Sequence, residues 1–316
     1  GVRVWPIGAV SRGQKGQSLT DAAALQEAGC VALSDDGVPV QDANLVRDAM
    51  IRCKRLGLTI LSHCEDADMV RNYAVNEGRV SRALGLPGRP AIAEEIMVMR
   101  DAMLAEETGA AVHICHVSTA GSVEIIRQFK KKGVAITCET CPQYFTLTED
   151  EVLEQGSLAR VNPPLRTKLD VEAILEGLRD GTIDVIATDH APHSVEEKAK
   201  PLAEAPSGMV GLETALGVTL TALYHTGFMD LSDILKKMTF HPACILRIPK
   251  GRLSLGGEAD FTIFSPDEEW TVEPDQFASK GRNTPFKGRK LKGRVKYTIV
   301  GGRVVYGDEG GRADVV

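Results

Sequence analysis

Several features are missing from this sequence of 316 residues, and each absence excludes a class of protein. No apolar run approaches the roughly 20 residues that a membrane-spanning helix requires. A large positive charge is also missing, because 37 Lys and Arg residues stand against 43 Asp and Glu residues. The resulting net charge of -6 disfavours nonspecific binding to nucleic acid or to an anionic membrane surface. We therefore expect a small-molecule substrate as the partner, with no role for nucleic acid or membrane.

Cysteine is too scattered for a disulfide framework. The seven cysteines are an odd number spread over a long chain, unlike the dense, even set of a small secreted domain. Cys138 and Cys141 form one CxxC pair without a second pair or nearby histidine, so we interpret both as packing residues. The first ten residues lack the basic region and the apolar stretch of a signal peptide. These observations favour a cytoplasmic protein.

What is present is an alternation of short apolar segments with helical patterns, from residue 2 to about residue 247. Val123, Ile126 and Phe129 illustrate the helical spacing, and Gly57, Gly109 and Gly133 each follow a helical pattern and precede a strand. This repeat predicts parallel strands joined by helices. The six expected strands are Arg3–Ala9, Cys30–Ser34, Thr59–Ser62, Val112–His116, Val134–Glu139 and Asp184–Thr188.

Two architectures fit such a repeat, a doubly wound sheet and a (β/α)8 barrel. Because six strands are counted, a complete barrel would need two more. From Gly251 onward the pattern changes to alternating strands interrupted by Gly and Pro, with no comparable long helix. We therefore predict an incomplete α/β barrel over residues 1–249 and a small antiparallel β domain over residues 250–316.

Polar residues gather where the predicted strands end. Carboxyl ends of parallel strands are the rim on which barrel enzymes build their active sites. Imidazoles and carboxylates on neighbouring strands supply the nitrogen and oxygen ligands that Zn²⁺ accepts. The pattern therefore favours a metal site over a set of unrelated structural residues. The residues concerned are Asp35, Asp36, His63, His116, Glu139, Asp189 and His190.

Two metal ions are chemically reasonable if a carboxylate bridges them and they share a hydroxide. Metal coordination lowers the pKa of water from about 15.7 towards 7, so that a nucleophile exists at neutral pH. A nearby aspartate can take the proton of that nucleophile and deliver it to a leaving nitrogen. Asp189 is our candidate for this role.

The motifs LSHCED, HICHVST, ETCPQYF, NPPLR, ATDHAPH and GLETAL, together with four others, span nearly the whole chain. In combination they closely resemble the bacterial dihydroorotases of the amidohydrolase superfamily. LSHCED and HICHVST are shared with hydantoinases and allantoinases, and ETCPQYF is particularly similar to hydantoinases. NPPLR, followed by ATDHAPH and GLETAL, favours dihydroorotase. The remaining motifs that carry the resemblance are LSDDGVPVQD, SGMVGLETAL, GRLSLGGEADFTIF and KGRNTPFKGRKLKG.

The resemblance implies reversible ring closure of N-carbamoyl-L-aspartate to L-dihydroorotate, a step of pyrimidine synthesis, with two zinc ions. Asp36 would bridge the two ions, and His63 and His116 would hold the second ion. Asp189 would ligate the first ion and act as the proton shuttle. Four residues would contact the substrate: Asn162, His193, Ser207 and Gly208.

The sequence departs from the family pattern in two places. The family often has Phe-Gly where this chain has Ser207-Gly208, so a backbone contact is expected to persist while the side-chain packing differs. The family also carries an HxH pair and a substrate-binding arginine on its first barrel strand, and this sequence has no HxH. We therefore expect about the first third of the usual protein to precede this chain, and the chain by itself to be inactive.

Other interpretations of the same residues stay open. Asp35, His113 and His190 are expected in structural roles, and Glu139 is expected to orient a ligand. The segment 191–208 is either a solvated connection or a mobile loop on the substrate side. Another cyclic amidohydrolase is the first alternative function. The second is a catalytically silent subunit that supports aspartate transcarbamoylase; a homodimer or a transcarbamoylase complex is compatible with the sequence.

Overall fold

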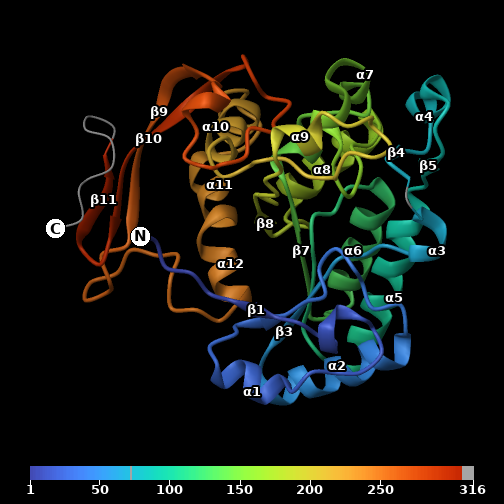
Figure 1. Ribbon diagram of the computed structural model, residues 1–316. Coiled ribbons are helices and arrows are strands. Elements are labelled where there is room, and N and C mark those ends of the chain that lie inside the picture. The colour runs from blue at the N-terminus through green and yellow to red at the C-terminus, as the bar shows by residue number, and fades with distance from the viewer. Residues whose placement is uncertain (72, 308–316) are drawn as a thin grey trace.

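The computed structural model describes residues 1–71 and 73–307, and its centre is a sheet of six parallel strands (Figure 1). The order of the strands is β1-β2-β3-β6-β7-β8, so each strand pairs with the next barrel strand along the chain. The six strands are β1 (Ile7–Gly8), β2 (Ala32–Leu33), β3 (Thr59–Ser62), β6 (Val112–Ile114), β7 (Ile136–Thr140) and β8 (Val185–Ile186).

This sheet confirms the predicted parallel architecture with six strands. Each observed strand lies within or overlaps one of the expected strands, and β3 has the predicted bounds. The other five observed strands are shorter than expected, and their buried centres include Ala32, Val112 and Ile114, which have no exposed surface. Parallel strands that are buried on both faces consist of continuous apolar residues, so their positions could be predicted from the sequence.

Helices follow the strands and cover the outer side of the sheet, where α2 packs on α5, α5 on α6, and α6 on α8. The helices of the described residues are α1 (Ala22–Glu27), α2 (Ala43–Leu56), α3 (Ala67–Val70), α4 (Arg79–Leu84), α5 (Ile92–Thr108), α6 (Ala120–Lys131), α7 (Glu151–Gln155), α8 (Lys168–Asp180), α9 (Val195–Lys198), α10 (Ala215–Thr219), α11 (Leu231–Met238) and α12 (Phe240–Ile245). Shorter helical turns are η1 (Arg12–Gln14), η2 (Pro142–Phe145), η3 (Gly156–Ala159), η4 (Leu220–Tyr224) and η5 (Pro274–Gln276).

Helix α2 shows why these segments are helical. The Asp42 side chain caps its first turn by accepting hydrogen bonds from the backbone N–H groups of Asn44 and Leu45. Met50 and Cys53, one helical turn apart, have no exposed surface. The helix ends at Gly57, whose φ of 71° is a left-handed conformation that glycine adopts without steric cost.

A second sheet lies beyond α10 and α12 in Figure 1, and its strands are antiparallel. Strand β10 (Lys290–Val300) pairs with β9 (Phe261–Thr271) on one side and with β11 (Arg303–Gly307) on the other. The change to antiparallel strands was expected for residues 250–316, of which 308–316 lie outside the described residues. Strand β10 also packs against α10, so the predicted domain boundary at residue 250 stays a prediction.

An excursion between β3 and α5 carries a small parallel pair of strands, β4 (Val75–Asn76) and β5 (Gly88–Arg89), outside the main sheet. Arg166 donates a hydrogen bond to the backbone carbonyl of Arg89 over 3.0 Å, which fastens the excursion to the segment after η3. The excursion therefore brings Arg89 close to the strand ends. Among the described residues, no helix is both long enough and apolar enough to cross a membrane.

Candidate metal centre

Three predicted ligands meet at the carboxyl edge of the parallel sheet. Asp36 follows β2, His63 follows β3 and His116 follows β6. The Nδ1 atom of His63 lies 2.8 Å from Nε2 of His116 and 3.3 Å from Oδ1 of Asp36. The same Oδ1 lies 3.5 Å from Nε2 of His116. Adjacent parallel strands thus place two imidazole nitrogens and one carboxylate oxygen around a common point.

The spacing of these three atoms fits a metal ion. Ligand atoms at about 2.0–2.1 Å from a tetrahedral zinc lie about 3.3 Å from one another. The two imidazole rings are oriented edge to face, with an interplanar angle of 77°, so the two nitrogens converge rather than stack. Nitrogen and carboxylate donors are the set that zinc accepts, and Mn²⁺, Co²⁺ and Fe²⁺ accept it as well. The residues present therefore fit a divalent transition metal.

The pKa values of Asp36 and His116 indicate the protonation state of the cluster without a bound ion. Hydrogen bonds from His116 and His63 hold the pKa of Asp36 far below its usual range, so this carboxylate is ionised. Burial lowers the pKa of His116, but the hydrogen bond with Asp36 and the charge of Asp189 outweigh it and raise that pKa to about 9. The raised pKa favours a protonated His116 imidazole, and a cation bound at this position would compete with that proton.

Asp189 lies near this cluster without joining its hydrogen bonds. Its ligand atoms are outside the group of Asp36, His63 and His116, whose ligand atoms all lie within 4.8 Å of one another. Burial raises the pKa of Asp189, and the charge of His116 opposes that effect. A carboxyl group with a raised pKa beside two imidazoles is suited to accept and return a proton.

The backbone is strained at two of these positions. His116 has a φ of 35° and Asp189 a φ of 46°, both in the left-handed region that residues other than glycine rarely adopt. Such a conformation costs about 1–3 kcal/mol and persists only where the surrounding structure holds it. His116 lies two residues after the end of β6, and Asp189 lies three residues after the end of β8, so both strained positions follow strands of the parallel sheet.

Two residues on the other side of His63, Glu65 and Arg89, were not predicted from the sequence. The Nε2 atom of His63 lies 3.4 Å from Nδ2 of Asn162 and 3.9 Å from Oε2 of Glu65. Arg89 donates hydrogen bonds to that Glu65 oxygen, over 2.7 Å, and to Oδ1 of Asn162. Glu65 stands two residues after His63, which is a usable signal, whereas Arg89 comes from the excursion and no motif marked it.

The predicted substrate residues His193, Ser207 and Gly208 form a separate group. Nε2 of His193 donates to the backbone carbonyl of Ser207 over 2.8 Å. Gly208 has a φ of 135°, and a Cβ there would lie 2.6 Å from the Cβ of Ala191, so only glycine fits. Among the described residues, no hydrogen bond or ion pair joins this group to Asp36, His63 or His116. Of the four predicted substrate residues, Asn162 is the one that contacts the cluster of Asp36, His63 and His116, through His63.

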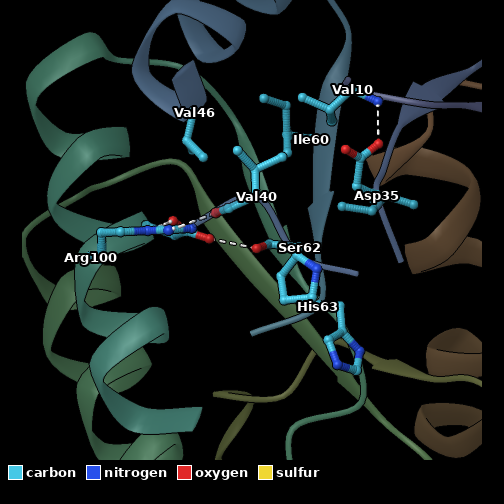
Figure 2. Close-up of a pocket in the computed structure, with 11 residues that line it drawn as sticks. Val10, Asp35, Val40, Val46, Ile60, Ser62, His63 and Arg100 are labelled. Carbon is cyan, nitrogen blue, oxygen red and sulfur yellow. Dashed lines mark hydrogen bonds and ion pairs between the residues drawn. The ribbon is translucent and has the colours of Figure 1, made fainter. Parts of the chain in front are cut away.

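The paired carboxylates Asp35 and Asp36 point in opposite directions. Asp35 is buried and accepts hydrogen bonds from the backbone N–H groups of Val10, over 2.8 Å, and Ser11. Figure 2 shows Asp35 and His63 among the residues that line a cavity of about 30 Å³, which is room for about one water molecule. Asp35 therefore holds Val10 and Ser11, which follow β1, beside the end of β2. Of the two carboxylates, Asp36 is the one that lies within ion-pair distance of the two imidazoles.

Three further polar residues at the strand ends have partners of their own. His113 contacts the Thr137 hydroxyl through Nδ1 and Glu139 through Nε2, over 2.8 and 3.2 Å. His190 accepts hydrogen bonds through Nδ1 from the backbone of Gly211 and Leu212. His113 therefore links β6 to β7 and places Glu139 beside it, whereas His190 links the segment after β8 to the segment before α10.

Comparison with known proteins gives the chain its relatives. A family model described as dihydro-orotase-like matches residues 1–122. A protein of Pelotomaculum thermopropionicum called dihydroorotase is 55% identical over 307 residues, covering 97% of this chain and 72% of that protein. One of Acetivibrio thermocellus with the same name is 50% identical over 304 residues, covering 96% and 71%.

Solved structures give the same architecture at lower identity. The L-hydantoinase (dihydropyrimidinase) of Arthrobacter aurescens has a TM-score of 0.81 and 27% identity, over 93% of this chain and 67% of that chain. A D-hydantoinase from a Bacillus species has a TM-score of 0.80 at 22% identity, over 93% and 70%. The described sheet of six strands is thus part of the amidohydrolase barrel.

Proposed function

This chain belongs to the dihydroorotase family, and from that premise we propose that the protein interconverts N-carbamoyl-L-aspartate and L-dihydroorotate at the edge of the parallel sheet. The observation that carries the proposal is the convergence of Asp36, His63 and His116, with 2.8–3.5 Å between their ligand atoms. The relatives at 50% and 55% identity are called dihydroorotase, whereas the hydantoinase is 27% identical. The substrate assignment therefore favours dihydroorotate over hydantoin.

Zinc is the proposed metal, with two ions in each complete site. Asp36 would bridge the ions, His63 and His116 would hold one of them, and Asp189 would ligate the other. When bound, the ions lower the pKa of a water molecule and polarise the amide carbonyl. Glu65 supports the assignment, because its carboxylate lies 3.9 Å from Nε2 of His63, beyond hydrogen-bond distance but within the range of an ion pair. A carboxylate near the second ring nitrogen is a common arrangement around a metal-binding imidazole.

Asp189 would move the proton. In the direction of hydrolysis, water adds to the ring carbonyl, the carbon–nitrogen bond breaks, and one proton passes from the water to the leaving nitrogen. The buried carboxylate of Asp189, whose pKa burial raises, would take that proton and deliver it to the nitrogen. In the synthetic direction the same carboxyl group takes the proton from the attacking nitrogen, and water leaves.

Substrate contacts would come from two directions. Asn162 lies beside His63, and Arg89 holds its carbonyl oxygen, so its amide nitrogen is directed towards the cluster. His193, Ser207 and Gly208 would approach from the segment after β8. All seven cysteines are free, which supports a reducing compartment, and we propose the cytoplasm.

Turnover of the whole, zinc-loaded protein with carbamoyl-aspartate, hydantoin and allantoin tests the substrate. We expect carbamoyl-aspartate to be converted at least tenfold faster than the other two. Dominant turnover of hydantoin would assign the protein to the hydantoinases instead. Absence of zinc and of all turnover, together with co-purification of aspartate transcarbamoylase, would favour a silent supporting subunit.

A further inference from the structure

The segment 191–208, which carries His193, Ser207 and Gly208, is closed at its base. The backbone N–H of Ala191 donates to the carbonyl of Met209 over 2.9 Å. The Asn283 side-chain amide donates to the carbonyls of both Ala191 and Gly208, over 3.1 and 3.0 Å. The two ends are therefore held side by side, and the 16 residues between them need a separate restraint if they are to keep one position.

Lys198 supplies that restraint. It ends helix α9, 5% of its surface is exposed, and its Nζ atom donates to the carbonyls of Arg160, Pro206 and Gly208 over 3.3, 2.9 and 3.0 Å. These contacts occupy all three hydrogens of the ammonium group. The Ser157 hydroxyl in turn donates to the carbonyl of Lys198. The middle of the segment is thus joined to its end and to the chain before Asn162.

Arg160 adds a second buried cation to the same place. Its Nη1 donates to the carbonyl of Leu202, and its Nε donates to the Ser207 hydroxyl over 3.3 Å. Among the described residues, neither Arg160 nor Lys198 forms an ion pair with a carboxylate. Burial lowers the pKa of both groups, and their mutual repulsion lowers that of Lys198 further. In the arrangement described, two positive charges are therefore buried without an acidic partner, which is energetically costly.

We propose that Lys198 is a positioning residue that holds the segment 191–208 against the site, and that its unbalanced charge, with that of Arg160, couples closure to an anionic substrate. This proposal rests on the proposed function, since dihydroorotate carries one carboxylate and carbamoyl-aspartate carries two. A ligand shifts a conformational equilibrium only if it binds one state better. A carboxylate bound beside Gly208 would reduce the cost of the two buried cations, so it would bind the closed state better.

Lys198→Met tests the proposal, because methionine keeps an unbranched chain and removes the three donated hydrogen bonds. Lys200→Met is the matched control: Lys200 lies two residues further along the same segment and is exposed. Hydrogen exchange of the amides in 191–208 would be followed without ligand and with dihydroorotate, and kcat and KM would be measured on the whole, zinc-loaded protein.

In Lys198→Met, exchange in the segment should accelerate about tenfold without ligand, and KM should rise about tenfold while kcat changes less than twofold. Adding dihydroorotate should slow the hydrogen exchange of the segment less in Lys198→Met than it does in the wild type. Lys200→Met should match the wild type in each measurement. Unchanged exchange and unchanged KM in Lys198→Met would overturn the proposal, as would a fall in kcat with KM unaltered.

A second variant decides the matter if circular dichroism shows that Lys198→Met does not fold. Ser157→Ala removes only the hydrogen bond to the carbonyl of Lys198, and exchange in 191–208 should then rise about threefold. Unchanged exchange would count against the restraint. Should the wild type turn over no dihydroorotate, the proposed function fails, while exchange without ligand still decides whether Lys198 holds the segment.

Discussion

The two halves of the proposed site are built in different ways. The cluster of Asp36, His63 and His116 is held by strand ends whose neighbours are paired through the parallel sheet, and both imidazoles are buried. The segment 191–208 instead contains one short helix, α9, and is held by side chains that donate to its backbone carbonyls. The cluster is therefore rigid with the sheet, whereas the segment depends on a few hydrogen bonds from Lys198, Arg160 and Asn283.

This difference separates two functions. A metal site needs ligand atoms fixed to within a few tenths of an ångström, which strands buried in a core provide. A substrate has to enter and leave, so the residues that cover it belong on a segment whose closure costs little to reverse. Variants of the cluster should therefore act on metal binding and on turnover, and variants of the segment should act mainly on KM.

The largest expected effect is on turnover. Asp189→Asn removes the proton acceptor and should lower kcat by about 10²–10⁴-fold while the protein stays folded. Stopped assays with dihydroorotate would measure kcat, and circular dichroism would monitor folding. Asp233→Asn, which changes an exposed aspartate paired with Lys236, is the control and should keep wild-type turnover. A kcat within threefold of wild type in Asp189→Asn would remove this residue from the proton transfer.

His63→Ala should remove zinc from the cluster. It takes away one of two imidazole ligands, so zinc measured by elemental analysis should fall by about one ion per chain. His225→Ala is the control, because His225 contacts the Pro266 carbonyl over 2.8 Å and the ring of Tyr224, and it is not part of the cluster of Asp36, His63 and His116. An unaltered zinc content in folded His63→Ala protein would contradict the assignment of His63 as a ligand.

Glu65→Gln should weaken zinc binding without abolishing it. Loss of a carboxylate that orients a metal-binding histidine typically lowers metal affinity 10–100-fold. Competition with a chelator would measure the affinity, and Glu77→Gln, at an exposed position of the same excursion, should leave it unchanged. Equal affinities in both variants would mean that Glu65 serves only to hold Arg89.

The smallest expected effect is a pH dependence of the segment. Burial lowers the pKa of Lys198 from 10.5 to about 8, so the closed segment binds fewer protons than an open one between these values. Closure should therefore become more favourable as the pH rises from 8 to 10.5 and should not change below pH 8. The ratio of exchange rates in Lys198→Met and wild type would report this effect. A ratio that stays constant over this range would show that Lys198 does not leave water on closure.

Sequence reasoning reached the cluster because its signals are local. Each strand is a largely apolar run, each candidate ligand stands within three residues of the end of one, and parallel pairing brings such positions to one edge, as it does for His63 and His116. The excursion that delivers Arg89 gives no such signal, because β5 has two residues and its place depends on packing. Lys198 could not be predicted for a different reason. In the sequence it is one of several charged residues in a polar stretch. Its burial depends on backbone carbonyls of residues distant from it along the chain, such as Arg160, and no sequence motif marks such contacts.

The proposed activity depends most on one point in space, the position between Asp36, His63 and His116. A crystal structure of the zinc-loaded protein, with anomalous scattering measured at the zinc edge, would locate the ion directly. We expect an anomalous peak at about 2.0–2.2 Å from Nδ1 of His63, Nε2 of His116 and a carboxylate oxygen of Asp36. Full activity in crystals or solution with no metal within 4 Å of these three atoms would contradict the central claim.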